Sequence, residues 1–236
     1  MSAPVRERWR ILIGAVSFAD AESVLRLAEK MSSALTLDLG GLLIEDTDAT
    51  GSPQARLVTS SGELVPGPSA EQAGVIARAE ARAFRAALSR LADVRGVGWS
   101  FEMRTGGLVS GLIGESRGWD LLAIGYRQVR RLSGRIIFIG ADGRAGGVAK
   151  AVVDALAAAL GARVERLPWP GDGETLDRLS RSHAAAVVVD PSDGRVLAEE
   201  ELRRLIDAAR CPLLIVGAGP RPDAPVLSDA SAGRSG

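Results

Sequence analysis

Residues 11–44, ILIGAVSFADAESVLRLAEKMSSALTLDLGGLLI, contain the pattern that decides the fold. The short apolar run Ile11–Val16 is typical of a strand that is buried on both faces. Apolar residues then recur at helical spacing over Val24–Leu35, which predicts an amphipathic helix with Asp20 as its N-cap. A second apolar run, Leu37–Ile44, predicts the next strand. This stretch therefore predicts a strand–helix–strand unit with parallel strands.

The same alternation continues along the chain on both sides of an arginine-rich segment. Further strands are expected at 99–103, 120–125, 135–140, 163–167, 185–190 and 213–216. Further helices are expected at 71–91, 108–116, 148–160, 174–182 and 198–206. Between them, residues 47–69 are rich in Gly, Pro, Ser and Thr, and predict a long loop. Strands that alternate with helices indicate an α/β protein with parallel sheets.

The segment 127–134 is interpreted as a linker between two domains. Its eight residues are too few for a helical crossover to a neighbouring parallel strand. The strand at 135–140 is therefore expected to begin a second sheet. The prediction is a tandem of two Rossmann-like domains, residues 8–128 and 134–217, followed by a disordered tail at 218–236.

Composition excludes several classes of function. The chain has 29 basic and 29 acidic residues, and this zero formal net charge argues against a dedicated nucleic-acid binder. A single Cys and a single His exclude an intramolecular disulfide framework and a clustered-histidine metal site. Cys211 is expected to be packed, as free cysteines usually are. No apolar run is long enough for a membrane span, so a cytoplasmic protein without membrane insertion is expected.

Several segments resemble the universal stress protein family. In the first half they are ILIGAVSFADAESVLRLAEKMSSAL, LDLGGLLIED, the long helix and GWDLLAIGYR; in the second half AARCPLLIVGA looks like the family's terminal helix and Cys-Pro strand. The resemblance implies two domains of the adenine nucleotide alpha hydrolase-like class, the second lacking one βα unit.

The chain departs from the family where the nucleotide-binding members bind ATP. In the family that this chain resembles, the nucleotide-binding members carry an Asp at the end of the first strand, where this chain has Ala15–Ser17. They also carry a loop G-x2-G-x9-G-(S/T) after the fourth strand. Here Gly125 is followed by Gln128 at the second glycine position, and no Gly-Ser or Gly-Thr closes the loop. A degenerate ATP site and no resident cofactor are therefore expected, because side chains obstruct a phosphate cradle.

A second glycine pattern suggests an alternative ligand site. Gly140, Gly143 and Gly146, with Gly147 after them, follow an expected strand and open an expected helix. This spacing resembles a dinucleotide-binding turn, in which glycines bring the pyrophosphate to a helix N-terminus. No clear ribose-binding acid follows about 20 residues later, and the remaining chain is short for a reductase. The two interpretations are nucleotide contact and a plain tight turn.

No assembled catalytic set appears in the sequence, so the expected function is a non-catalytic regulatory or interaction module of the stress-protein type, not an enzyme. The alternative is a nucleotide-dependent sensor or enzyme that uses Gly140–Gly147.

The acidic residues Glu45, Asp46 and Asp48 are interpreted as a solvated loop start, and no metal site is predicted. The strand ending at Ile124 would lie at an open edge, covered by the strand 213–216 or by a second chain; a homodimer is favoured.

Overall fold

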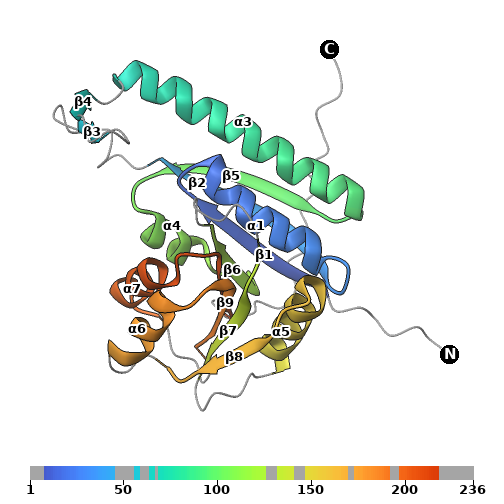
Figure 1. Ribbon diagram of the computed structural model, residues 1–236. Helices are drawn as coiled ribbons and strands as arrows, with labels where there is room; N and C mark the ends of the chain where they lie inside the picture. The colour runs from blue at the N-terminus through green and yellow to red at the C-terminus, as the bar shows by residue number, and fades with distance from the viewer. Residues whose placement is uncertain are drawn as a thin grey trace.

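The computed structural model describes residues 8–45, 56–58, 64–66, 69–125, 132–140, 147–169, 173–191 and 197–217. Within them, eight strands form one sheet in the order β5-β2-β1-β6-β10-β9-β7-β8 (Figure 1). The strands of the sheet are β1 Arg8–Ala15, β2 Thr36–Glu45, β5 Trp99–Thr105, β6 Leu121–Ile124, β7 Arg135–Gly140, β8 Val164–Leu167, β9 Ala184–Asp190 and β10 Leu213–Val216. Every neighbouring pair in this sheet is parallel except β6–β10.

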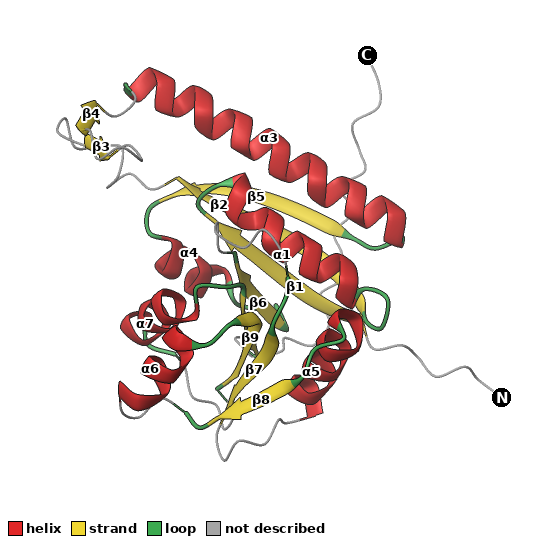
Figure 2. Ribbon diagram, viewed as in Figure 1, coloured by secondary structure: helices red, strands yellow, loops and turns green. Residues whose placement is uncertain are grey.

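Helices cover both faces of the sheet, giving three layers (Figure 2). The helices are α1 Phe18–Met31, α3 Ala70–Arg95, α4 Leu108–Glu115, α5 Gly147–Leu160, α6 Gly173–Arg181 and α7 Glu199–Ala209. One hydrophobic core lies under α1, α3 and α5, and a second lies under α4, α6 and α7. The central strands are buried on both faces, which explains their continuous apolar sequences.

The expectation of two separate sheets is wrong. Strands β5, β2, β1 and β6 come from the first half of the chain, and β10, β9, β7 and β8 come from its second half, yet all eight belong to one sheet. As expected from the short segment 127–134, β7 is not the parallel neighbour of β6. Strand β7 nevertheless belongs to the same sheet, because β10 and β9 lie between β6 and β7.

Strand β10 covers the expected open edge of β6 within the same chain. Leu213 pairs with Ile124 and Val216 pairs with Leu121, in antiparallel register. Of the two arrangements expected for this edge, the structure has the intrachain one. The edge of β6 therefore gives no reason for a homodimer, and the association state stays a prediction.

Most element positions agree with the sequence-based expectations, with two local differences. Helix α1 begins earlier than expected, because Ser17 and not Asp20 is its N-cap: the Asp20 N–H donates to Ser17 Oγ at 3.2 Å. The expected loop 47–69 contains an antiparallel hairpin of β3 Arg56–Val58 and β4 Leu64–Pro66. The rest of that loop up to Pro68, most of the linker and the tail 218–236 lie outside the described residues.

Candidate functional site

An open α/β sheet typically binds ligands outside the carboxyl ends of two neighbouring strands from which the chain continues in opposite directions across the sheet. Such a place is called a topological switch point, and this sheet has two. The first lies between the carboxyl ends of β1 and β6, and the second lies between those of β7 and β9. Because the two halves of the sheet meet through the antiparallel pair β6–β10, the two switch points lie at opposite ends of the strands.

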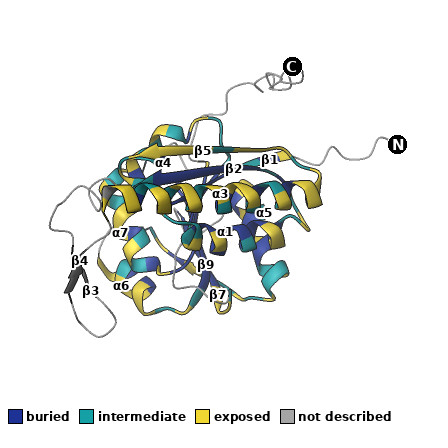
Figure 3. Cartoon of the chain, turned by 90° about the horizontal axis from the view of Figure 1, so that it is seen from above, coloured by how far each residue is buried: buried dark blue, intermediate teal, exposed yellow. Residues whose placement is uncertain are grey.

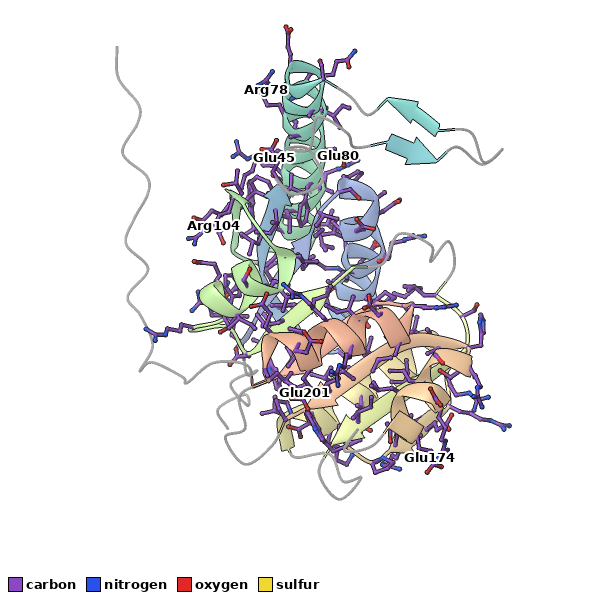
Figure 4. The ribbon with its side chains drawn as sticks, turned by 90° about the vertical axis from the view of Figure 1, so that its left-hand side faces the viewer. Glu45, Arg78, Glu80, Arg104, Glu174 and Glu201 are labelled. Atoms are coloured by element: carbon purple, nitrogen blue, oxygen red, sulfur yellow. The ribbon has the colours of Figure 1, made fainter. Side chains whose placement is uncertain are left out.

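The first switch point is closed by the protein's own groups at the start of α1. Ser17 Oγ accepts from the Asp20 N–H and donates to Asp20 Oδ2 at 2.6 Å. The N–H of Phe18, the first residue of this helix, donates to the Glu80 carboxylate of α3. Helix N-termini can bind phosphates through such N–H groups, and here the Glu80 carboxylate accepts from one of them (Glu80 is labelled in Figure 4).

Gly125, which follows β6, packs against the start of α1 at the same switch point. A Cβ atom at Gly125 would lie 1.9 Å from the backbone oxygen of Asp20, so no other residue fits there without moving α1. The first glycine of the expected loop is thus explained by packing of β6 against the start of α1. Asp20, Glu80 and Gly125 thus make contacts within the protein at this switch point, and the degeneracy of the ATP site stays a prediction.

The second switch point brings together only part of the predicted glycine site. Gly140 ends β7 and lies opposite Asp190, the last residue of β9, whose side chain is buried. A Cβ at Gly140 would lie 2.6 Å from the ring of Phe138, so packing alone requires glycine at this position. Gly147 begins α5, and a Cβ there would meet no atom of the described residues within 4 Å, whereas Gly143 and Gly146 lie outside the described residues.

The charges around the second switch point differ from helix to helix. Helix α7 starts with Glu199, Glu200 and Glu201, and the indole N–H of Trp169 donates to Glu201 at 2.9 Å. Helix α6 carries Glu174 in its first turn, whereas α5 has no acidic residue there. Because carboxylates repel phosphate, the start of α5 is the most favourable place for an anion among these three helix starts.

The remaining candidate residues that the structure describes do not come together as a further site. Cys211 is 5% exposed, and burial raises the pKa of its thiol from 9.0 to about 12, so it is packed as expected. Among the described residues, no group of three or more Cys, His, Asp or Glu side chains could hold a metal ion. Glu45 ends β2, while Asp46 and Asp48 lie outside the described ranges.

Sequence reasoning missed Glu80, although a signal for it exists. Glu80, Phe84 and Leu88 recur at intervals of four, and the last two are fully buried. A carboxylate on the inward stripe of a helix requires a partner, because an unpaired buried charge is costly. The partner, the Phe18 N–H, lies 62 positions away in the sequence.

Comparisons with known proteins show only distant structural likeness. No family model and no curated protein matches the sequence. A protein of unknown function from Pseudomonas aeruginosa is similar over 90% of this chain and 93% of its own, with 10% identity and a TM-score of 0.45. A putative universal stress protein from the same species is similar over the same shares, with 11% identity and a TM-score of 0.42. These values assign neither a family nor a function to the chain.

Over the ranges that the structure describes, no helix is both long and apolar enough to span a lipid bilayer.

Proposed function

We propose that this chain is a non-catalytic regulatory module of the universal-stress-protein type, which acts by contact with another macromolecule and does not use ATP at its first switch point. The observation that carries the proposal is the Glu80 carboxylate on the Phe18 N–H. A nucleotide phosphate would have to displace this carboxylate from the helix start. It would also approach Asp20, a second acidic side chain at the same place.

A second candidate function is nucleotide binding at the other switch point, by the segment from Gly140 to Gly147. It is favoured by the start of α5, which has no acidic residue in its first turn and where a Cβ at Gly147 would meet no described atom within 4 Å. Asp190 lies beside Gly140 and would face the sugar or base of a ligand whose phosphate binds at α5. In this case the chain would be a nucleotide-dependent sensor or enzyme.

Thermal unfolding with ATP, AMP, NAD and NADP separates the two functions. A ligand that binds only the folded state stabilises it by about 2.7 kcal/mol at 100 times its dissociation constant. The regulatory proposal expects no shift in the unfolding temperature with any of the four compounds. A shift of several degrees contradicts it.

Two glycine variants then locate any binding that is found. Gly147→Val places a branched side chain at the start of α5, where a Cβ would meet no described atom within 4 Å and the fold is expected to tolerate it. Gly114→Val, at an open position in α4, is the matched control. A nucleotide shift that is lost in Gly147→Val and kept in Gly114→Val supports the second candidate function, whereas a shift kept in both variants places the ligand elsewhere.

A further inference from the structure

Strand β5 is the outermost strand on its side of the sheet, and no described strand pairs with its outer edge. Its inner edge pairs with β2 through the even-numbered residues: the Leu39 N–H donates to the oxygen of Gly98 at 2.9 Å, and the Gly106 N–H donates to Glu45 at 3.0 Å. Backbone groups alternate in direction along a strand. The N–H and C=O groups of Phe101, Met103 and their odd-numbered neighbours therefore point outward.

The two faces of β5 carry different side chains, and much of both is exposed (Figure 3). On the face toward α3, Trp99 is 39% and Met103 is 37% exposed, while Phe101 packs edge-on against Phe84. Large apolar side chains on a free edge are a feature that proteins normally avoid or cover.

The face toward α4 carries a pair of opposite charges. Arg104 contacts Glu102 on the same strand at 2.9 Å and Glu115 of α4 at 2.6 Å. Glu102 and Arg104 stand two residues apart, so their side chains lie on one face of the strand.

Among antiparallel registers centred on Glu102, Met103 or Arg104, only one sets the opposite charges of two copies against each other. When two identical strands pair antiparallel about a two-fold axis, an axis through Glu102 or Arg104 sets like charges directly opposite each other. An axis through Met103 sets each Glu102 opposite the second copy's Arg104. Both residues direct their backbone groups to β2, so these cross-strand pairs are of the non-hydrogen-bonded type, in which side chains approach most closely.

We propose that β5 is the surface by which two copies of this chain associate, with antiparallel strands centred on Met103. The outward N–H and C=O groups of Phe101, Met103 and Thr105 supply the backbone hydrogen bonds. The two Glu102–Arg104 pairs select the register, and the Met103 side chains of the two copies meet at the axis. A single strand pair buries little surface, so the dimer is weak and concentration-dependent. This inference is independent of nucleotide binding and of the proposed regulatory function.

Charge exchange tests the register directly, by sedimentation velocity on the full chain over the micromolar range. Glu102→Arg leaves the Arg104–Glu115 pair in place and sets two arginines against two arginines, so we expect dimerisation to weaken by about tenfold or more. Arg104→Glu is expected to weaken it similarly. An equimolar mixture of the two variants restores opposite charges across the interface and is expected to dimerise as heterodimers.

A proline variant tests the backbone pairing. The Met103 N–H points away from β2, so Met103→Pro removes a hydrogen bond between copies without removing one within the sheet. Met103→Ala is the matched control, and circular dichroism checks that both variants are folded. The proline variant is expected to be monomeric where the alanine variant still dimerises. A wild-type chain that stays monomeric at every concentration, or a Glu102→Arg chain that dimerises as well as the wild type, overturns the proposal.

Discussion

Replacing Glu80 tests the closure of the first switch point through its effect on the free energy of unfolding. Glu80→Gln keeps an oxygen that can accept from the Phe18 N–H but removes the negative charge at the start of α1. A charge at a helix N-terminus contributes about 0.3–1 kcal/mol, so this variant is expected to lose about 0.5 kcal/mol. Glu80→Ala removes the acceptor as well. Hydrogen bonds to charged groups contribute about 1.5–3 kcal/mol, but Phe18 and Glu80 are half-buried and water can replace part of the loss, so about 1.5 kcal/mol is expected.

The assay is urea unfolding followed by circular dichroism, at low and at high salt. The difference between wild type and Glu80→Gln is expected to shrink at high salt, because salt screens the charge contribution. Arg82→Gln, at an exposed position on the same helix, is the control and is expected to stay within about 0.5 kcal/mol of the wild type. A Glu80→Ala variant as stable as this control would refute the role assigned to the carboxylate.

Three further predictions concern packing and titration. Gly40→Ala puts a Cβ 2.2 Å from the Trp119 ring and is expected to cost about 1–3 kcal/mol in urea unfolding; an unchanged midpoint would contradict the packing described. The folded-state pKa of Cys211, about 12, lies above the ordinary 9.0, so the thiol contributes stability below pH 9 that is lost as pH rises toward 12. Cys211→Ala should therefore show a shallower loss of stability over that range, and an identical slope would count against burial as the cause. Trp169→Phe removes the 2.9 Å hydrogen bond to Glu201 and should lower the free energy of unfolding by about 1 kcal/mol, whereas equal stability would show that this bond contributes nothing.

The helices and strands could be predicted because their signals are local. The apolar run 11–16 and the helical spacing that follows it depend only on residues within a few turns of one another. The arrangement of the sheet could not be predicted in this way. It depends on the pairing of Leu213 with Ile124, for which the sequence left two alternatives open, the strand 213–216 and a second chain. The composition of the two strands does not decide between these alternatives, because both strands are short and apolar, as are several strands that do not pair with them.

The candidate site was predictable only in part, for the same reason. The absence of the expected Asp and glycines near Val16 and Gly125 predicts a site without its phosphate cradle, and this stays a prediction. The group that closes it, the Glu80 carboxylate, comes from a distant helix whose approach is set by packing of Phe84 and Leu88 against the sheet. A glycine also has two explanations that sequence cannot separate: at Gly140 the Phe138 ring requires it, whether or not a ligand binds.

The pairing of β6 with β10 also sets an order of events during synthesis. Strand β10 is the last described strand to leave the ribosome, and until it does, β6 has no neighbour on that side. This strand, Leu121–Ile124, is wholly apolar, and unpaired apolar edges make incompletely folded chains prone to aggregation. The first half must therefore wait, incomplete, for the second half to be translated. A ribosome stalled before residue 213 would present this strand to chaperones, and release of the final strand would complete both halves in one step.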